Sequence, residues 1–379
     1  IIIENKMKRI VIKIGSQIVL DDEEKEGSNY LNNILSEIVH LRSKGYIFTI
    51  VSSGAVALAK KNISLKNNYE VTTSSKQALS SIGQVYLMNK YKSFFNSHEI
   101  ECAQVLAGRD NFNSRLAYLN IRSALEELYS YNVIPIINEN DVVSTMEIEG
   151  KFYGDNDRLA AIVSNAIDAD LLILFGKTNG LYTADPTRNK DSKIIKEVKK
   201  IDNEIISYAS EPGDNIGSGG MKSKIEAANI CMESGIKCSI SNVQFEDTIL
   251  RIINSEDIGT KFIPTKQKKE SKKRWLLTGL SESKGKIIID EGASNAMLNK
   301  GASLLSVGIK LTQGEFSRGD IVVVENVQKN QIGFGISNYN FDEVKKLIGK
   351  DSKELNNILL VNHGDEIIHR NNFVFLENK

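Results

Sequence analysis

Three glycines and two lysines stand directly before a helix-forming run in the segment GSGGMKSKIEAANI, Gly217 to Ile230. A helix N-terminus carries unpaired N–H groups and a partial positive charge, glycines let the backbone approach a ligand closely, and lysines add full charges. The combination indicates a phosphate-binding turn, although GSGG alone is equally typical of a surface loop. It is not the GxxxxGK[ST] pattern, because that pattern places its lysine directly after the second glycine.

Other short polar motifs lie where strand-like runs end or helical runs begin. They are KIGS with Lys13 and Gly15, VSSGA with Ser53 and Gly54, INEND with Asn138 to Asp141, GDND with Asn156 and Asp157, and FGK with Gly176 and Lys177. Ligands of parallel α/β sheets bind beyond the carboxyl ends of the strands. We therefore expect these motifs and the lysine-rich turn to share one site.

The residue types in these loops favour phosphoryl transfer. The four histidines lie outside them, and no Ser–His–acid, Cys–His or zinc-ligand spacing is visible, so no metal site on the protein is expected. Phosphoryl transfer depends mainly on positioning and charge neutralisation. A carboxylate acceptor is already an anion and needs no general base, so the difficulty is to bring two anions together.

Lys13 and Lys224 are the candidate pair that would bring them together, and Asp157 is available to hold both lysines in place. The run from Asn138 to Asp141 is a poor phosphate site, but it suits an ammonium group. The sequence therefore predicts a kinase that acts on the carboxylate of an amino acid.

The elements that must position these residues alternate along the first two thirds of the chain. Nearly all-apolar runs predict buried strands, and the longer runs between them have a helical period. The order strand–helix–strand predicts a mostly parallel, three-layer α/β sheet. Strands are expected at Arg9–Ile14, Ile47–Val51, Val133–Ile137, Leu171–Phe175 and Lys237–Ser241, and helices at Tyr30–Ser43, Lys76–Phe95, Ser114–Ser130 and Asp157–Ile167.

The residue composition of the chain changes after residue 263. Residues 264–274, PTKQKKESKKR, hold six cations and one Glu without an apolar period, which is typical of a linker. Short strand signals and glycine-bearing turns follow. We expect a kinase domain over 7–263, a basic linker over 264–274, and a small, mainly β, barrel-like domain over 275–379. Its strands are predicted at Trp275–Leu277, Lys286–Ile289, Gly319–Val324 and Glu366–His369, and its helices at Ala293–Lys300 and Phe341–Ile348.

Composition narrows the class of protein. Of 379 residues, 41% are hydrophobic and 25% charged, and Lys+Arg equals Asp+Glu at 48 each. A net charge of zero argues against a chain built to coat nucleic acid or an anionic membrane. Three cysteines suggest free thiols in a reducing compartment, and no apolar run approaches the roughly 20 residues of a membrane helix. A cytoplasmic protein with no membrane partner is expected.

Seven motifs together resemble the amino acid kinase family, and within it the enzymes that phosphorylate L-glutamate. They are VIKIGS, VSSGAVA, SKQALSSIGQ, VIPIINENDVV, YGDNDRLAAI, GLYTADP and GSGGMKSK, in family order from Arg9 to Ile240. The later segments KKRWLLTGL, IIIDEGASNAMLNKGASLLSVGI and GEFSRGD resemble a PUA domain. The resemblance covers nearly the whole chain after Met7.

The resemblance implies transfer of the ATP γ-phosphoryl group, with Mg²⁺, to the side-chain carboxylate of L-glutamate. This is the first step of proline biosynthesis, and inhibition by L-proline and a homo-oligomer are implied with it. Lys13 and Lys224 match phosphate-stabilising lysines, and Asp157 the aspartate that organises them. The implied glutamate-binding residues are Ser53, Gly54, Asn138, Asp141 and Asn156. The implied ATP-binding residues are Lys13, Gly15, Gly176, Lys177, Ser218, Gly219, Gly220, Met221, Lys222, Ser223 and Lys224.

One departure and two alternatives stay open. The family usually has Thr-Asp after the fourth strand, where this chain has Gly176 and Lys177, so the nucleotide contacts there are unassigned. The chain could be another amino acid kinase, although an acetylated amine could not use an ammonium site. It could also be a regulatory protein that binds RNA through the PUA-like domain, but its zero net charge does not favour RNA as a partner.

Overall fold

The computed structural model describes residues 8–20, 29–64, 72–108, 111–112, 114–143, 156–209, 220–243, 246–264 and 283–375. The chain divides into two compact units, one formed by residues up to 268 and the other by residues from 269 on, with residues 114–120 counted in the second. No helix among the described residues is long and apolar enough to cross a membrane.

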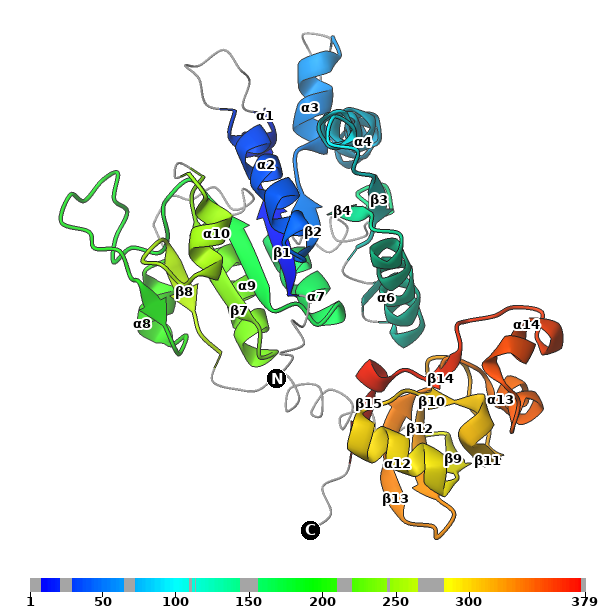
Figure 1. Ribbon diagram of the computed structural model, residues 1–379. Helices are drawn as coiled ribbons and strands as arrows, with labels where there is room; N and C mark the ends of the chain where they lie inside the picture. The colour runs from blue at the N-terminus through cyan, green and yellow to red at the C-terminus, as the bar shows by residue number, and fades with distance from the viewer. Residues whose placement is uncertain are drawn as a thin grey trace. The chain divides into compact units, whose positions relative to one another are not determined.

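An eight-stranded sheet forms the centre of the first unit (Figure 1). Its strands, in the order β3-β4-β2-β1-β5-β7-β8-β6, are β1 (Arg9–Ile14), β2 (Ile47–Ser52), β3 (Cys102–Leu106), β4 (Ile134–Asn138), β5 (Leu171–Phe175), β6 (Glu197–Val198), β7 (Lys237–Ser241) and β8 (Thr260–Phe262). Neighbouring strands are parallel except β7 and β8, which are antiparallel. The expected mostly parallel sheet is confirmed.

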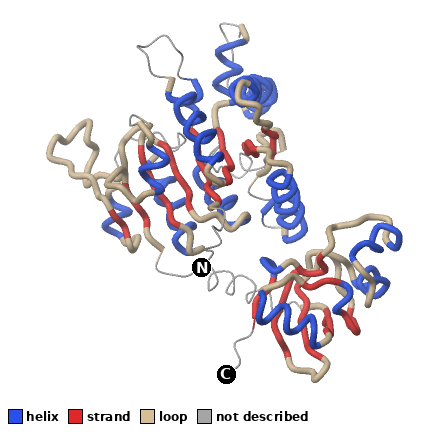
Figure 2. Tube along the Cα trace, viewed as in Figure 1, coloured by secondary structure: helices blue, strands red, loops and turns tan. Residues whose placement is uncertain are grey.

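Helices cover both faces of this sheet (Figure 2). They are α1 (Ser16–Leu20), α2 (Tyr30–Ser43), α3 (Ala55–Asn62), α4 (Thr73–Asn96), α6 (Arg115–Ser130), α7 (Asn156–Ala166), α8 (Asn203–Ser207), α9 (Met221–Glu233) and α10 (Thr248–Ile253). One apolar core joins the sheet to α2, α4 and α10, and a second core joins its other face to α6, α7 and α9. The three-layer arrangement is therefore confirmed.

Strand β1 shows how residue alternation decides which face a side chain meets. Ile10, Ile12 and Ile14 belong to the core on the α2 side, whereas Val11 belongs to the core on the α7 and α9 side. Successive side chains of a strand point to opposite faces, so Lys13 lies on the same face as Val11. The lysine of KIGS is thereby directed toward the two helices whose first turns carry Asp157 and Lys224.

Several boundaries differ from the sequence expectations. Strands β1, β5 and β7 and helix α2 have the predicted bounds, but helix α4 begins three residues earlier, at Thr73, where Thr72 and Ser75 form a capping box. Strand β3 was not predicted. Helix α3 is short and begins at Ala55, directly after Gly54, whose φ of +112° suits glycine and which supplies no side-chain cap.

The second unit contains a five-stranded sheet in the order β11-β9-β12-β13-β15. It also contains a two-stranded sheet of β10 and β14. Its elements are β9 (Gly285–Ile289), α12 (Glu291–Lys300), β10 (Leu304–Leu305), β11 (Ile309–Gly314), β12 (Ile321–Asn326), β13 (Gln331–Ile336), α13 (Phe341–Leu347), α14 (Leu355–Ile358), β14 (Glu366–Ile368) and β15 (Phe373–Phe375). The expected mainly β character is confirmed, and the strand expected at 275–277 lies outside the described residues.

Candidate active site

Asp157 lies between the two lysines singled out in the sequence. Its Oδ1 is 2.6 Å from Lys13 Nζ, and its Oδ2 is 3.0 Å from Lys224 Nζ and accepts a hydrogen bond of 2.7 Å from Ser223 Oγ. Asp157 is fully buried, and each lysine is only 6% exposed. The structure thus brings together three side chains that lie far apart in the sequence.

The charges in this cluster do not balance. Burial by itself would raise the pKa of the Asp157 carboxyl, but the ammonium groups of Lys13 and Lys224 and the Ser223 hydroxyl hold that pKa below its ordinary value. Asp157 is therefore an anion that compensates one of the two buried cations. Among the described residues the cluster holds two cations and one anion at short range, and such a set favours an anionic ligand beside the lysines.

Glycines lie beside both lysine side chains, where a larger residue would come into contact with them. A Cβ on Gly176 would lie 3.1 Å from Lys224 Cε, and a Cβ on Gly15 would lie 3.9 Å from Lys13 Nζ. Helix α9 begins after Gly220, which gives it no side-chain cap, and the N–H groups of a helix's first turn suit an anionic ligand. Lysines, glycines and a helix N-terminus make a donor set that fits the phosphate groups of a nucleotide.

The other predicted ATP-binding residues differ from one another in burial and in contacts. Met221 is half-buried, and Lys222 and Lys177 are exposed. Ser223 contacts Asp157, which places it in the lysine cluster. Ser218 and Gly219 lie outside the described residues.

A second polar cluster surrounds Asn156, the first residue of α7. Its Nδ2 donates to Ser53 Oγ at 2.7 Å, to Asn138 Oδ1 at 3.0 Å and to the Ser52 carbonyl at 3.2 Å. Asn156 is buried, and its Oδ1 has no hydrogen-bond partner among the described residues. Because Nδ2 is occupied by acceptors, the amide presents an unused acceptor oxygen to a ligand.

Asp141 adds a carboxylate to the same edge of the sheet, three residues beyond the end of β4. Its Oδ2 accepts a hydrogen bond of 2.5 Å from Ser80 Oγ, which belongs to α4 and is 1% exposed. The sequence did not identify Ser80, because a serine within a long helical run gives no sign of its distant partner. Acceptor oxygens from Asp141 and Asn156 suit a cation such as an ammonium group.

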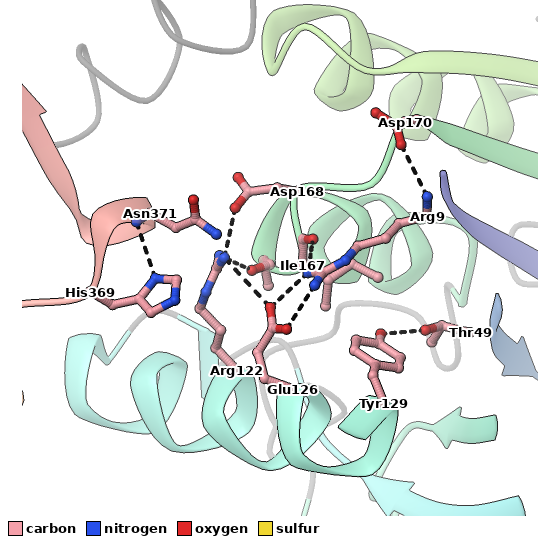
Figure 3. Close-up of polar contacts among 11 residues, drawn as sticks. Arg9, Thr49, Arg122, Glu126, Tyr129, Ile167, Asp168, Asp170, His369 and Asn371 are labelled. Atoms are coloured by element: carbon pink, nitrogen blue, oxygen red, sulfur yellow. Dashed lines mark hydrogen bonds and ion pairs between the residues drawn. The ribbon is translucent and has the colours of Figure 1, made fainter. Parts of the chain in front are cut away.

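The far end of α7 is held by two arginines, which Figure 3 shows converging on Ile167 and Asp168. Arg9, the first residue of β1, donates to the Ile167 carbonyl at 2.9 Å and makes a bidentate pair with Glu126 at 2.6 and 2.7 Å. Arg122 donates to Asp168 Oδ2 at 2.7 Å. Cations near a helix C-terminus are favourable, so α7 is anchored at both ends.

Two protein-family models match this chain, one in each of its two parts. The model of the amino acid kinase family matches residues 8–242, and the model of the PUA domain matches residues 285–359. The chain is 39% identical to the glutamate 5-kinase of Dehalococcoides mccartyi (strain CBDB1), over 98% of this chain and 100% of that protein.

Two further relatives carry the same name. The glutamate 5-kinase of Thermoanaerobacter sp. (strain X514) is 38% identical over 97% of this chain and 98% of its own length. That of Aliivibrio fischeri (strain ATCC 700601 / ES114) is 36% identical over the same shares. With the family match over most of the chain, these identities confirm the resemblance inferred from the motifs: the chain belongs to the amino acid kinase family.

Proposed function

We propose that this protein transfers the γ-phosphoryl group of ATP to the side-chain carboxylate of L-glutamate, which yields ADP and L-glutamate 5-phosphate, the first step of proline biosynthesis. The observation that carries the proposal is the buried Lys13–Asp157–Lys224 cluster, which joins the carboxyl end of β1 to the first turns of α7 and α9. The naming of full-length relatives at 36–39% identity as glutamate 5-kinases supports the choice of substrate.

The chemistry assigned to the cluster is electrostatic. The phosphoryl donor ATP and the acceptor carboxylate are both anions, so they repel each other. Two cations on either side of the transferred group offset that repulsion. Lys13 and Lys224 supply those cations, and Asp157 fixes the distance between them. No general base is required, because the attacking carboxylate oxygen already carries the electron pair that forms the new P–O bond.

Magnesium belongs to the proposal as the ion that arrives with ATP and neutralises its phosphate charge. Among the described residues no group of three or more His, Cys, Asp and Glu could hold a metal by itself. The two ammonium groups of the lysine cluster suit phosphate oxygens and not a cation.

The polar cluster at Asn156 and Asp141 is assigned to the α-ammonium group of glutamate. The unused Oδ1 of Asn156 and the carboxylate of Asp141 are acceptors, and Ser53 is tied to Asn156 at 2.7 Å. An acetylated amine has lost its charge and two of its donors, so such a site rejects acetylglutamate.

Replacing Asp141 by alanine is expected to raise the KM for glutamate about 10- to 100-fold, because a hydrogen bond to a charged group is lost. The kcat is expected to stay within about threefold, since the interaction is made equally in the ground and transition states. Steady-state kinetics with varied glutamate at saturating ATP measures both. Val143→Ala, in the same loop at an exposed position, is the control. A normal glutamate KM in Asp141→Ala would remove Asp141 from the amino-acid site.

The proposed activity is tested by glutamate-dependent ADP release from ATP–Mg²⁺ in the presence of hydroxylamine, which traps an acyl phosphate. Hydroxamate formed from glutamate, and not from aspartate or acetylglutamate, is the expected result. Turnover of either of those two without turnover of glutamate would contradict the proposal and point to another amino acid kinase.

Regulation, assembly and location extend the proposal. L-proline is expected to lower the hydroxamate signal, and light scattering is expected to show a homo-oligomer, as the resemblance implies. A cytoplasmic location is proposed with them, and fractionation of the source cells measures it. Full activity at every proline concentration would remove the inhibitor from the proposal without affecting the reaction.

A further inference from the structure

One face of helix α4 contacts two loops of the candidate active site. Gln77, Ser80 and Gly83 are spaced three residues apart, so they lie on the same side of the helix. Gln77 Nε2 donates to the Val142 carbonyl at 3.3 Å, and Ser80 Oγ donates to Asp141 Oδ2 at 2.5 Å. Both contacts reach the loop that follows β4.

Gly83 brings the same face of α4 against the loop that follows β2. A Cβ on Gly83 would lie 1.7 Å from the carbonyl oxygen of Ala55, the first residue of α3. Such a contact is impossible without moving backbone, so only glycine allows this approach. Ala55 comes directly after Ser53 and Gly54, and α4 therefore touches the segment that carries Ser53.

The loop beyond Asp141 has little apolar anchoring of its own. Val142 is 52% exposed and Val143 is 66% exposed, whereas Ser80 beneath them is 1% exposed. A hydrogen bond from a hydroxyl to an ionised carboxylate is charge-assisted, and burial of the donor reduces competition from water. The position of the Asp141 carboxylate is thus tied to a rigid helix of 24 residues.

We propose that Ser80 is a positioning residue for amino-acid recognition: it holds the Asp141 carboxylate at the place where the ammonium group of the substrate binds. Gln77 and Gly83 complete this contact face, which sets the spacing between the Asp141 loop and the Ser53 loop. The inference rests on the proposed function, and it adds α4, which carries the motif SKQALSSIGQ but was given no site residue from the sequence, to the determinants of specificity.

The direct test compares Ser80→Ala with Ser81→Ala. Ser81 is the adjacent, exposed serine, and its Oγ bonds only to the Gln77 carbonyl of its own helix among the contacts seen. Ser80→Ala is expected to raise the glutamate KM about tenfold, which equals about 1.4 kcal/mol, with kcat and the ATP KM within about twofold. Ser81→Ala is expected to leave all three constants unchanged. Equal effects of the two substitutions, or a loss confined to kcat, would overturn the proposal.

A second measurement separates positioning from a general loss of stability. In an Asp141→Asn background, Ser80→Ala is expected to raise the glutamate KM by less than about twofold further, because residues that act through one contact are not additive. The full tenfold effect in that background would mean that Ser80 acts elsewhere. Equal thermal midpoints for Ser80→Ala and Ser81→Ala would confirm that the fold is intact.

Amide hydrogen exchange over residues 139–143 tests the contact without any substrate. Exchange in this loop is expected to be faster in Ser80→Ala and unchanged in Ser81→Ala. If the wild-type protein formed no hydroxamate from glutamate, the proposed function would be wrong. The exchange rates would still show whether Ser80 holds the loop in place. If the wild-type protein phosphorylated glutamate but loop exchange did not change in Ser80→Ala, the positioning role alone would fail.

Discussion

Asp157→Asn should lower turnover by about 1,000-fold or more, the largest catalytic effect expected of any substitution in this protein. The carboxylate fixes the ammonium groups of Lys13 and Lys224 at 2.6 and 3.0 Å from its two oxygens. An asparagine is nearly the same size, but it carries no charge and offers one acceptor in place of two. The two lysines then repel each other, and neither stays where the transferring phosphoryl group needs it.

The same substitution should also destabilise the fold, by about 3–5 kcal/mol, because it removes the buried carboxylate that pairs with both Lys13 and Lys224. Single-turnover hydroxamate formation measures the first effect, and urea unfolding followed by circular dichroism measures the second. Asp257→Asn is the control, since Asp257 pairs with Lys196 at an exposed position and should contribute at most about 1 kcal/mol. Near-normal turnover in folded Asp157→Asn would exclude Asp157 as the organiser of the lysines.

The stability gap between the wild-type protein and Asp157→Asn should depend on pH in one direction. The folded-state pKa of Asp157 is held below its ordinary value of 3.8, chiefly by the two ammonium groups acting against burial. The contribution of the carboxylate is therefore fully present above about pH 3.8 and is lost as the pH falls from there through the folded-state pKa. Urea midpoints of both proteins, measured from pH 7 downward, should differ by a constant amount until that region. A gap that already narrows near neutral pH would show that the pKa is raised and not lowered.

Lys224→Ala should lower kcat by about 100- to 1,000-fold while the glutamate KM changes by less than about threefold. In the proposed mechanism the ammonium group of Lys224 acts on charge that develops in the transition state, whereas the amino-acid contacts are assigned to Asn156 and Asp141. Rate constants at saturating ATP and glutamate separate the two constants.

This variant should keep most of the stability that Asp157→Asn loses. Removing Lys224 leaves Asp157 paired with Lys13 at 2.6 Å, so one cation and one anion remain in balance. Lys237→Ala, at the exposed start of β7, is the matched control and should change neither constant. An effect of Lys224→Ala confined to the glutamate KM would contradict its assignment to the transition state.

The strands and helices that the sequence predicted well are those with a strong, uninterrupted pattern. Strands β1, β5 and β7 are nearly all-apolar runs, because each is covered by helices on both faces. Strand β3 was missed since it lies at the edge of the sheet, where Gln104 and alternating exposure interrupt the run. Strand β13, QIGFGI, was missed because glycine is depleted in strands.

The antiparallel pairing of β7 with the three-residue strand β8 could not be inferred either. A strand of this length has no measurable period, and its partner is chosen by the tertiary core that buries Phe262. Local patterns therefore predicted the central, parallel strands of the sheet and failed toward both of its edges.

The sequence by itself predicted a chemistry for the site. Lys13, Lys224 and Asp157 stand at strand and helix ends, where a parallel sheet collects its functional groups, and their types suit the joining of two anions. Only the tertiary structure decided which groups hold one another. Ser80 donates a hydrogen bond to Asp141, which is 61 residues away in the sequence. Asn156 donates one from its Nδ2 to Ser53, which is 103 residues away. Such contacts leave no periodic trace in the sequence, because they depend on how two loops and one helix pack and not on local conformational preference.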